Sequence, residues 1–151
     1  MEANHPNAIR EATEADIPRI VEMGARSLAE GPYKDIIAGT AAAEKLARDL
    51  VASAAAKVLL YERDGETVGL VAFTVLPHFF SGEPTGTEVM WFVLPEHRQS
   101  FAAVALLRAA ERIARAMGAK QMQFTAPTPE VGRMYELLGY AVIEIGYQRT
   151  L

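Results

Sequence analysis

Cysteine is absent from this chain, which excludes disulfides, thiolate metal sites and cysteine nucleophiles together. A mechanism through an acyl-cysteine is excluded for the same reason. Long apolar runs are also missing: no stretch approaches the ~20 apolar residues of a membrane-spanning helix, and segment 1–10 lacks the apolar core of a signal peptide. We therefore expect a cytoplasmic protein without a membrane partner.

Basic residues are fewer than acidic ones, 15 against 19, and the formal net charge is -4. Domains that bind nucleic acid usually carry a basic stripe, so we expect no nucleic-acid partner. A mildly acidic chain is compatible with a cationic acceptor such as an amine. None of the three histidines has a metal-ligand spacing to another histidine or acid, so we expect no metal.

The chain has a size and composition typical of one globular domain. It contains 151 residues, of which 50% are hydrophobic and 23% charged. No internal repeat, low-complexity segment or linker interrupts it. The sequence therefore predicts a single domain over residues 1–151.

Hydrophobic periodicity and turn residues predict an alternation of strands and helices. The expected strands are Ala8–Glu11, Lys57–Arg63, Glu66–Leu76, Thr87–Val93, Gln121–Thr125 and one bent or two short strands within Tyr140–Leu151; the expected helices run from about Ile17 to Gly31, over Thr40–Ala54, from the region of Ala102 to Met117, and over Pro129–Leu138. This order is that of an α/β (α+β) fold with a mixed, mostly antiparallel central sheet and helices on both faces.

One stretch organises the others, because the apolar segment Thr87–Val93 is stopped by Pro95 and passes through Arg98 into the long helix. The first backbone N–H groups of a helix have no partner within it, and the helix dipole adds partial positive charge there. A strand that leads into such a helix is a typical phosphate site.

The same stretch resembles a family signature. Val93, Pro95, Arg98 and Ala103 match the pattern V-x-P-x-x-R-x-x-G-x-G/A, which binds acyl-coenzyme A in the GNAT superfamily of N-acetyltransferases. Phe101 stands where the family usually has glycine, so a benzyl group replaces a hydrogen where the backbone approaches the pyrophosphate.

A second segment, Met134–Tyr140, resembles the fourth helix of the family and its exit, commonly Y-E-x-x-G-F/Y. The two motifs occur in the expected order, and the predicted strands and helices agree with the GNAT fold along nearly the whole chain. The resemblance implies acetyl-CoA as co-substrate, a small-molecule or peptide amine as acceptor, direct transfer in a ternary complex, and a possible homodimer.

The resemblance also implies a coenzyme site made largely of backbone. Amides near Phe92, Val93 and Leu94 would hold the acetyl carbonyl, and Arg98 would meet phosphate, unless it forms a surface ion pair. The remaining expected contacts are the pyrophosphate turn, Gln99, Ser100, Phe101, Ala102 and Ala103, and Thr128, which takes the place of a coenzyme-touching asparagine or is simply a turn residue.

Two residues are the catalytic candidates. The family commonly uses the tyrosine of the fourth helix to protonate the departing thiolate, which implies Tyr135 here. A carboxylate on the central strand often serves as base, and Glu88 is the only acid between Thr87 and Leu94. Each has a structural alternative, because Glu88 could face solvent and Tyr135 could pack against Trp91 or a neighbouring leucine.

The acceptor site is expected in loops, whose shape one sequence does not determine. Tyr33 and the cluster His78, Phe79 and Phe80 are candidates for lining it, although aromatic packing or a dimer contact would equally explain the cluster. Two other functions stay open: a GNAT-like domain without turnover that acts as a binding or assembly module, and a different α/β enzyme that binds another phosphate ligand.

Overall fold

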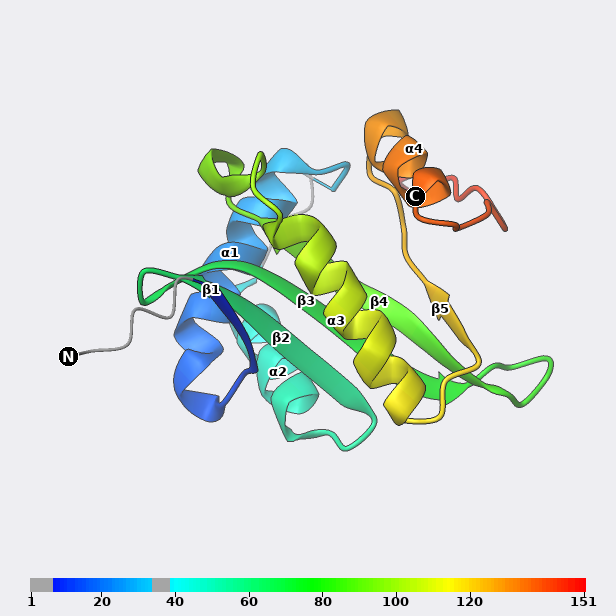
Figure 1. Cartoon of the computed structure of the whole chain (residues 1–151), viewed down its shortest axis with the longest axis horizontal. Coiled ribbons are helices and arrows are strands. Elements are labelled where there is room, and N and C mark those ends of the chain that lie inside the picture. Colours follow the sequence, from blue (N-terminus) through cyan, green and yellow to red (C-terminus); the bar gives the residue numbers. More distant parts are fainter. Residues whose placement is uncertain (1–6, 34–38) are drawn as a thin grey trace.

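The computed structural model describes residues 7–33 and 39–151, so most of the expected loop Tyr33–Gly39 lies outside the described residues. Five strands and four α-helices follow one another along the chain (Figure 1). They are β1 (Asn7–Glu11), α1 (Ile17–Glu30), α2 (Thr40–Ala52), β2 (Ala56–Arg63), β3 (Glu66–Pro77), β4 (Pro84–Val93), α3 (Ala102–Ala116), β5 (Gln121–Gln123) and α4 (Pro129–Leu137), with 3₁₀ turns η1 (Glu14–Asp16) and η2 (Pro95–His97).

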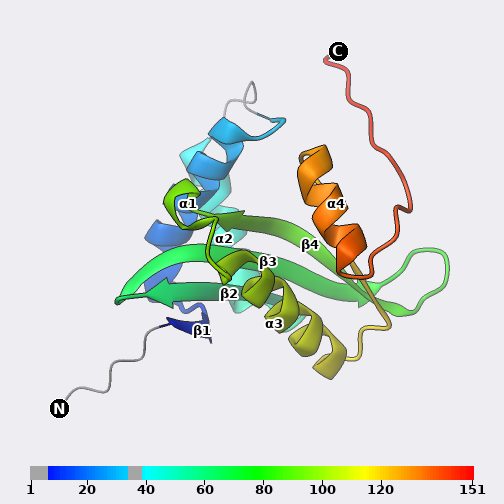
Figure 2. The same ribbon diagram turned by 45° about the horizontal axis from the view of Figure 1, so that its top comes forward.

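The strands form one sheet in sequence order, β1-β2-β3-β4-β5. Every neighbouring pair is antiparallel except β4 and β5, which are parallel. Helix α3 crosses one face of the sheet, while α1 and α2 cover the other (Figures 1 and 2). The predicted mixed, mostly antiparallel sheet with helices on both faces is therefore confirmed.

The hairpin between β2 and β3 forms where the sequence predicts it. Asp64 and Gly65 both have positive φ, 51° and 80°, as a two-residue turn matched to the strand twist requires. The turn fixes the register that pairs Arg63 with Glu66.

The core lies on both faces of the sheet, against α3 on one side and against α1 and α2 on the other, where Met23 of α1 is fully buried. Leu106, Leu107 and Ala110 of α3 are fully buried against the sheet. The helix approaches so closely at Gly69 of β3 that a Cβ there would lie 3.1 Å from side-chain atoms of Leu106 and Val93. This contact holds the end of β4 beneath the beginning of α3 and so fixes the turn between them.

A charged cluster fastens β1 to the beginning of α1. The guanidinium of Arg10 donates to both carboxylate oxygens of Asp16 at 2.8 Å and to Glu62 of β2 at 2.8 Å. Asp16 also accepts the backbone N–H of Thr13 at 2.8 Å. These hydrogen bonds, above all those from Arg10, hold the pKa of Asp16 well below its usual range.

We expect Asp16→Ala to lower the free energy of unfolding by about 1–2 kcal/mol at neutral pH, because the partly buried carboxylate serves both Arg10 and the Thr13 amide. Because the pKa of Asp16 is lower in the folded than in the unfolded chain, its carboxylate stabilises the fold above the unfolded-state pKa. The loss in free energy of unfolding caused by Asp16→Ala should therefore shrink as the pH falls below about 4. Urea unfolding at several pH values measures this free energy. The control is Asp49→Ala, whose exposed pair with Lys45 should matter by less than about 0.5 kcal/mol; equal losses would contradict the prediction.

The expected terminal strands are wrong: the structure has no strand from Tyr140 to Leu151. An alternating pattern shows that one face of a segment is apolar and suited to burial. A strand also requires a neighbouring strand, and none lies beside this segment among the described residues. Strand β5 is also shorter than expected. It ends at Gln123 instead of Thr125 because the Thr125 N–H donates to a side chain, Glu88, and not to a strand.

Candidate active site

Strands β4 and β5 separate at a defined point. The β3–β4 register shifts so that Ala72 faces Met90 while Phe73 faces Glu88, which leaves Val89 without an opposite residue. Such a bulge bends and twists its strand. The parallel pairing with β5 stops two residues before the bulge, at Thr87 and Gln123. From Glu88 onward the edge of β4 is open, as the divergence of the two strands in Figure 1 shows.

Glu88 lies in this opening. It is half-buried, and its Oε2 accepts the N–H of Thr125 at 2.8 Å, which bridges the gap where the strand pairing ends. Burial raises the pKa of the Glu88 carboxyl above its ordinary value, and the hydrogen bond from Thr125 offsets part of this. The residue is therefore not a simple solvent-facing strand position.

Tyr135 of α4 also contacts the backbone of Thr125. Its side chain is 5% exposed, and its hydroxyl is 3.4 Å from the carbonyl oxygen of Thr125, to which it donates. Burial, and next the charge of Glu88, raise the pKa of the Tyr135 hydroxyl. The two catalytic candidates thus meet on the backbone of Thr125, one at its N–H and one at its C=O.

Aromatic rings surround this pair. The ring centroid of Tyr135 is 5.6 Å from those of Trp91 and Phe124, and 5.7 Å from that of Tyr140. The ring of Tyr135 therefore packs against Trp91, as the structural alternative supposed, while its hydroxyl donates to the Thr125 carbonyl. The indole N–H of Trp91 is buried and has no hydrogen-bond partner among the described residues.

Backbone direction distinguishes the three residues expected to bind the acetyl carbonyl. The Leu94 N–H donates to Val68 of β3 at 2.9 Å. Because N–H groups alternate between the two edges of a strand, Phe92 also directs its amide toward β3, while Val93 directs its own toward the opening. The Val93 carbonyl confirms this direction, since it accepts Arg98 Nε at 2.9 Å.

The turn before α3 leaves several amides free. No acceptor in the described part of the chain takes the N–H of Gln99, Phe101 or Ala103. The Ala102 N–H donates to the Ser100 hydroxyl oxygen at 3.3 Å. The Phe101 ring is 87% exposed, so it does not lie over these amides. The helix start keeps the uncovered donors that an anion needs.

Arg98 is engaged within the chain. Its Nη2 is 2.6 Å from Glu30 Oε2 at the end of α1, and its guanidinium lies 5.2 Å from the ring centroid of Phe92. The side chain is 46% exposed. An anion at the helix start would therefore compete with Glu30 for Arg98.

The remaining candidates do not gather at one place. The Thr128 hydroxyl oxygen accepts the Val131 N–H and so caps α4, as a turn residue does. Tyr33 follows α1 and is 50% exposed. The cluster His78, Phe79 and Phe80 lies at the β3–β4 turn, at the opposite end of β4 from Arg98 (Figure 1). The ring centroids of Phe79 and Phe80 are 4.2 Å apart with the rings tilted by 41°, and the two residues are 83% and 85% exposed. The structure does not bring this cluster and Tyr33 together.

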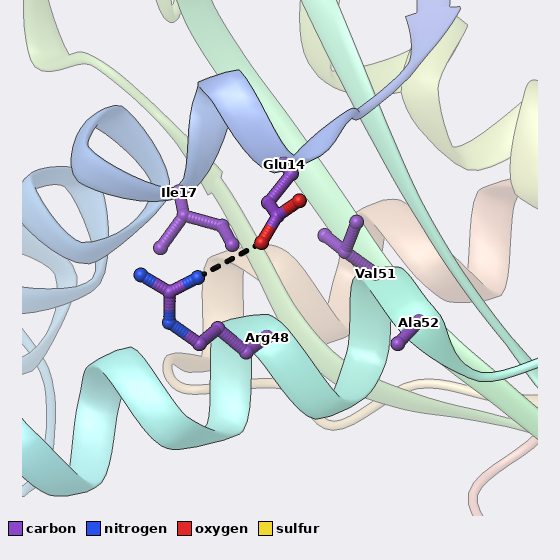
Figure 3. Close-up of a pocket in the computed structure, with 5 residues that line it drawn as sticks. All are labelled: Glu14, Ile17, Arg48, Val51 and Ala52. Carbon is purple, nitrogen blue, oxygen red and sulfur yellow. Dashed lines mark hydrogen bonds and ion pairs between the residues drawn. The ribbon is translucent and has the colours of Figure 1, made fainter.

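Two cavities lie on the α1–α2 side. One of about 240 Å³ is lined by Ile17, Val51 and Ala52 and crossed by the ion pair of Glu14 and Arg48 (Figure 3); it contains no candidate residue. The other, about 80 Å³, has a mainly apolar lining. It extends between α1, α2 and the sheet to the bulge at Val89 and Met90.

The described ranges 7–33 and 39–151 contain no group of three acidic, histidine or cysteine residues placed to bind a metal ion. Within the same ranges no helix is long and apolar enough to cross a membrane.

The sequence did not indicate the importance of Thr125. Nothing in its residue type points to chemistry, because it acts through its backbone. The bulge at Val89 was equally invisible, since it exists only in the pairing of β4 with β3. One signal was available: a single acid within the apolar strand Thr87–Val93 requires a partner when the strand is buried.

A central sheet that opens between its fourth and fifth strands, next to a helix start with free amides, defines an acetyltransferase fold. The model of the acetyltransferase (GNAT) family matches residues 26–140. The chain therefore belongs to the GNAT family of acetyltransferases.

Solved structures agree along nearly the whole chain. A ribosomal-protein-alanine N-acetyltransferase from Brucella melitensis biovar Abortus 2308 is 26% identical, with 97% of this chain and 100% of that chain covered and a TM-score of 0.75. A transcriptional regulator from Bacillus halodurans C-125 is 21% identical over 96% and 99% of the two chains, TM-score 0.77. AAC(6')-Iy in complex with the bisubstrate analog CoA-S-monomethyl-acetylneamine is 18% identical over 96% and 99%, TM-score 0.75. No curated protein sequence matches the chain significantly.

Proposed function

We propose that this acetyltransferase moves the acetyl group of acetyl-CoA to an amine by direct attack in a ternary complex. The observation that supports it most is the meeting of Glu88 and Tyr135 on the backbone of Thr125, within the opening of the sheet. In the reaction a nitrogen–carbon bond forms and a carbon–sulfur bond breaks. The amine loses one proton and the departing thiolate gains one, so a base and an acid are both required.

Acetyl-CoA, when bound, supplies the thioester whose carbonyl carbon accepts the amine. The free amides of Gln99, Phe101 and Ala103, together with the dipole of α3, would hold its pyrophosphate. Arg98 would add a charged donor after leaving Glu30. The exposed ring of Phe101 leaves room for this contact.

The amide of Val93 is the proposed donor to the acetyl oxygen. It faces the opening, whereas the Leu94 amide is occupied by Val68. A backbone donor fixed by a sheet needs no reorganisation as negative charge develops on that oxygen, which makes it effective.

Glu88 would take the proton of the amine and Tyr135 would give one to the thiolate. The raised pKa of Glu88 makes it a better base than an ordinary glutamate near neutral pH. The pKa of Tyr135 is raised in part by the charge of Glu88. Once Glu88 is protonated that charge disappears and the pKa of Tyr135 falls, so the acid becomes stronger when the thiolate needs a proton.

The acceptor is proposed to be the amine of a small molecule or a peptide, approaching from the α1–α2 side, where the apolar cavity reaches Val89 and Met90. Tyr33 follows α1, one of the two helices that line this cavity. The net charge of -4 suits a cationic acceptor. A cytoplasmic location, where acetyl-CoA is available, and a homodimer complete the proposal.

A binding module without turnover is the second candidate. It is favoured by Phe101 in the pyrophosphate turn and by the ion pair that ties Arg98 to Glu30. Such a module should release little or no heat when acetyl-CoA is titrated into it. The enzyme should bind the coenzyme and release free thiol when an acceptor amine is added, which can be screened over amines, amino acids, aminoglycosides and peptide N-termini.

We expect Arg98→Ala to weaken acetyl-CoA binding about tenfold, because a charge-assisted contact with phosphate is lost. Glu30→Gln removes the competing carboxylate and should tighten binding. Calorimetry measures both affinities, and the coenzyme-induced rise in melting temperature should change in parallel. Arg133→Ala, at an exposed pair on α4, is the matched control and should bind like the natural chain. An unchanged affinity in Arg98→Ala would exclude Arg98 from the coenzyme site.

A further inference from the structure

The smaller of the two cavities begins next to the proposed base. It lies between α1, α2 and the sheet, and its lining includes Val89 and Met90, the two residues after Glu88 on β4. Neighbouring residues of a regular strand point to opposite faces of a sheet. The bulge at Val89 interrupts this alternation, so that both residues line the same cavity. The cavity therefore starts one residue from the carboxylate that would take the proton of the amine.

The lining of this cavity is apolar throughout. None of its twelve residues has a charged or polar side chain. Two of them, Leu46 of α2 and Val89 of β4, are 50% and 41% exposed, so they form an apolar rim in contact with water. An apolar cavity takes up apolar groups and not water, and one of about 150 Å³ can hold a benzene ring. By that scale, a cavity of about 80 Å³ suits an aliphatic group of about three carbons.

Gly24 keeps the cavity open on the side of α1. It lies in the interior of α1, where glycine is less favourable than alanine because it loses more conformational freedom. Close packing does not require it, since the only atom listed near a Cβ built at this position is the Met90 sulfur, at an ordinary 3.9 Å. Such a Cβ would take space from the cavity, because Gly24 and Met90 both line it. Glycine at this position therefore lowers helix stability and leaves the cavity open.

We propose that this cavity, kept open by Gly24, binds a small aliphatic group of the acceptor, next to the reactive amine. The inference rests on the proposed function, because it assigns the acceptor of that reaction. The acceptor class is an amine whose neighbouring carbon carries a branch of about three carbons, either in a free amine or amino acid or in the first residue of a peptide. A side chain with a second charge is disfavoured, because the lining offers it no partner.

The first test measures kcat/KM for thiol release from acetyl-CoA with amino acid amides that differ only in their side chains. Each carbon buried in an apolar site contributes about fourfold, so the value should rise from glycinamide through alaninamide to valinamide, by about 60-fold in all. Lysinamide should fall below valinamide because its side chain is charged, and phenylalaninamide because its ring is too large. A series without preference for valinamide over glycinamide would overturn the proposal.

The source of the aliphatic group is determined with three further probes. Free valine, isobutylamine and a tripeptide that begins with valine all carry the same branch beside the amine. The probe with the highest kcat/KM shows whether the acceptor is an amino acid, a simple amine or a peptide.

Two variants change the cavity in opposite directions. Gly24→Ala fills part of it and should lower kcat/KM for valinamide about tenfold more than that for glycinamide. Its melting temperature should rise, because alanine favours a helix. Leu46→Ala widens the rim and should shift the preference from valinamide to leucinamide, which is one carbon longer.

Gly132→Ala is the matched control, because it makes the same change inside α4, where the new Cβ would lie 3.6 Å from that of Ala126. It should raise the melting temperature and keep the preference for valinamide. If Gly24→Ala behaved in the same way, the cavity would be a packing void and the proposal would be overturned.

Binding is measured apart from turnover, so that failure of the proposed function is distinguished from failure of this inference. Saturation-transfer NMR with coenzyme A present reports whether the methyl groups of valinamide contact the protein. If no amine leads to thiol release, but valinamide binds better than glycinamide and Gly24→Ala removes the difference, the proposed function fails and the assignment of the cavity stands. If all the amides bind and react alike, the proposed function stands and the assignment of the cavity fails.

Discussion

Glu88→Gln is expected to lower kcat by about 100-fold or more while leaving the affinity for acetyl-CoA nearly unchanged. Glutamine can still accept the N–H of Thr125, so the bridge across the opening is kept, but it cannot take a proton from the amine. Steady-state thiol release gives kcat, and calorimetry gives the coenzyme affinity. Glu83→Gln, an exposed acid before the same strand, is the control.

The pH dependence gives an independent readout of Glu88. Its pKa is raised by burial, so activity should fall as the pH is lowered through a value above that of an ordinary glutamate. The fold binds this proton more tightly than the unfolded chain does. The folded state therefore gains stability as the pH falls through that range, and Glu88→Gln should show neither change. Equal rates in Glu88→Gln and Glu83→Gln would remove Glu88 from the mechanism.

Tyr135→Phe is expected to lower kcat by about 100-fold with little effect on coenzyme binding, because it removes the proton donor and keeps the ring. The ring contacts with Trp91 and Phe124 should remain, and the long hydrogen bond to Thr125 contributes little. Single-turnover rates at saturating acetyl-CoA separate the chemical step from binding.

Tyr140→Phe is the matched control for this prediction. It lies in the same aromatic cluster, but its hydroxyl donates to Glu111 and not to Thr125. We expect a lower melting temperature and a kcat close to that of the natural chain. If Tyr135→Phe lost coenzyme affinity and kcat to the same extent, Tyr135 would be a packing residue.

Much of the fold follows from local sequence. Asp64-Gly65 specifies a tight hairpin, since both positions require positive φ. The apolar stripe of α3 and Gly118, with φ of 94°, set the length and end of that helix. Interactions of this kind act over a few residues, so they can be recognised without knowing what the segment packs against.

The site was predictable only in part. Two motifs indicated Tyr135 and the amides that open α3, because both depend on fixed spacing. Glu88 stood out as a single acid within an apolar strand. The pairing of Arg98 with Glu30 could not be foreseen, because the two residues are far apart in sequence and meet only when α1 packs beside the turn.

Residues 140–151 show the limit of what an alternating pattern predicts. Alternation of Ile143, Glu144 and Ile145 predicts a strand, yet no described strand pairs with this segment. A two-residue period describes which face is apolar and says nothing about which edge will cover it.

By itself the sequence determined the order of helices and strands as far as α4, the two family motifs and the chemical groups available, because these depend on residue type and short spacing. Only the tertiary structure decided that β4 bulges at Val89 and parts from β5, and that Glu88 and Tyr135 meet at Thr125. The reason is physical: strand register and long-range hydrogen bonds are settled by the packing of the whole sheet, and a backbone N–H or C=O has no signature in the sequence.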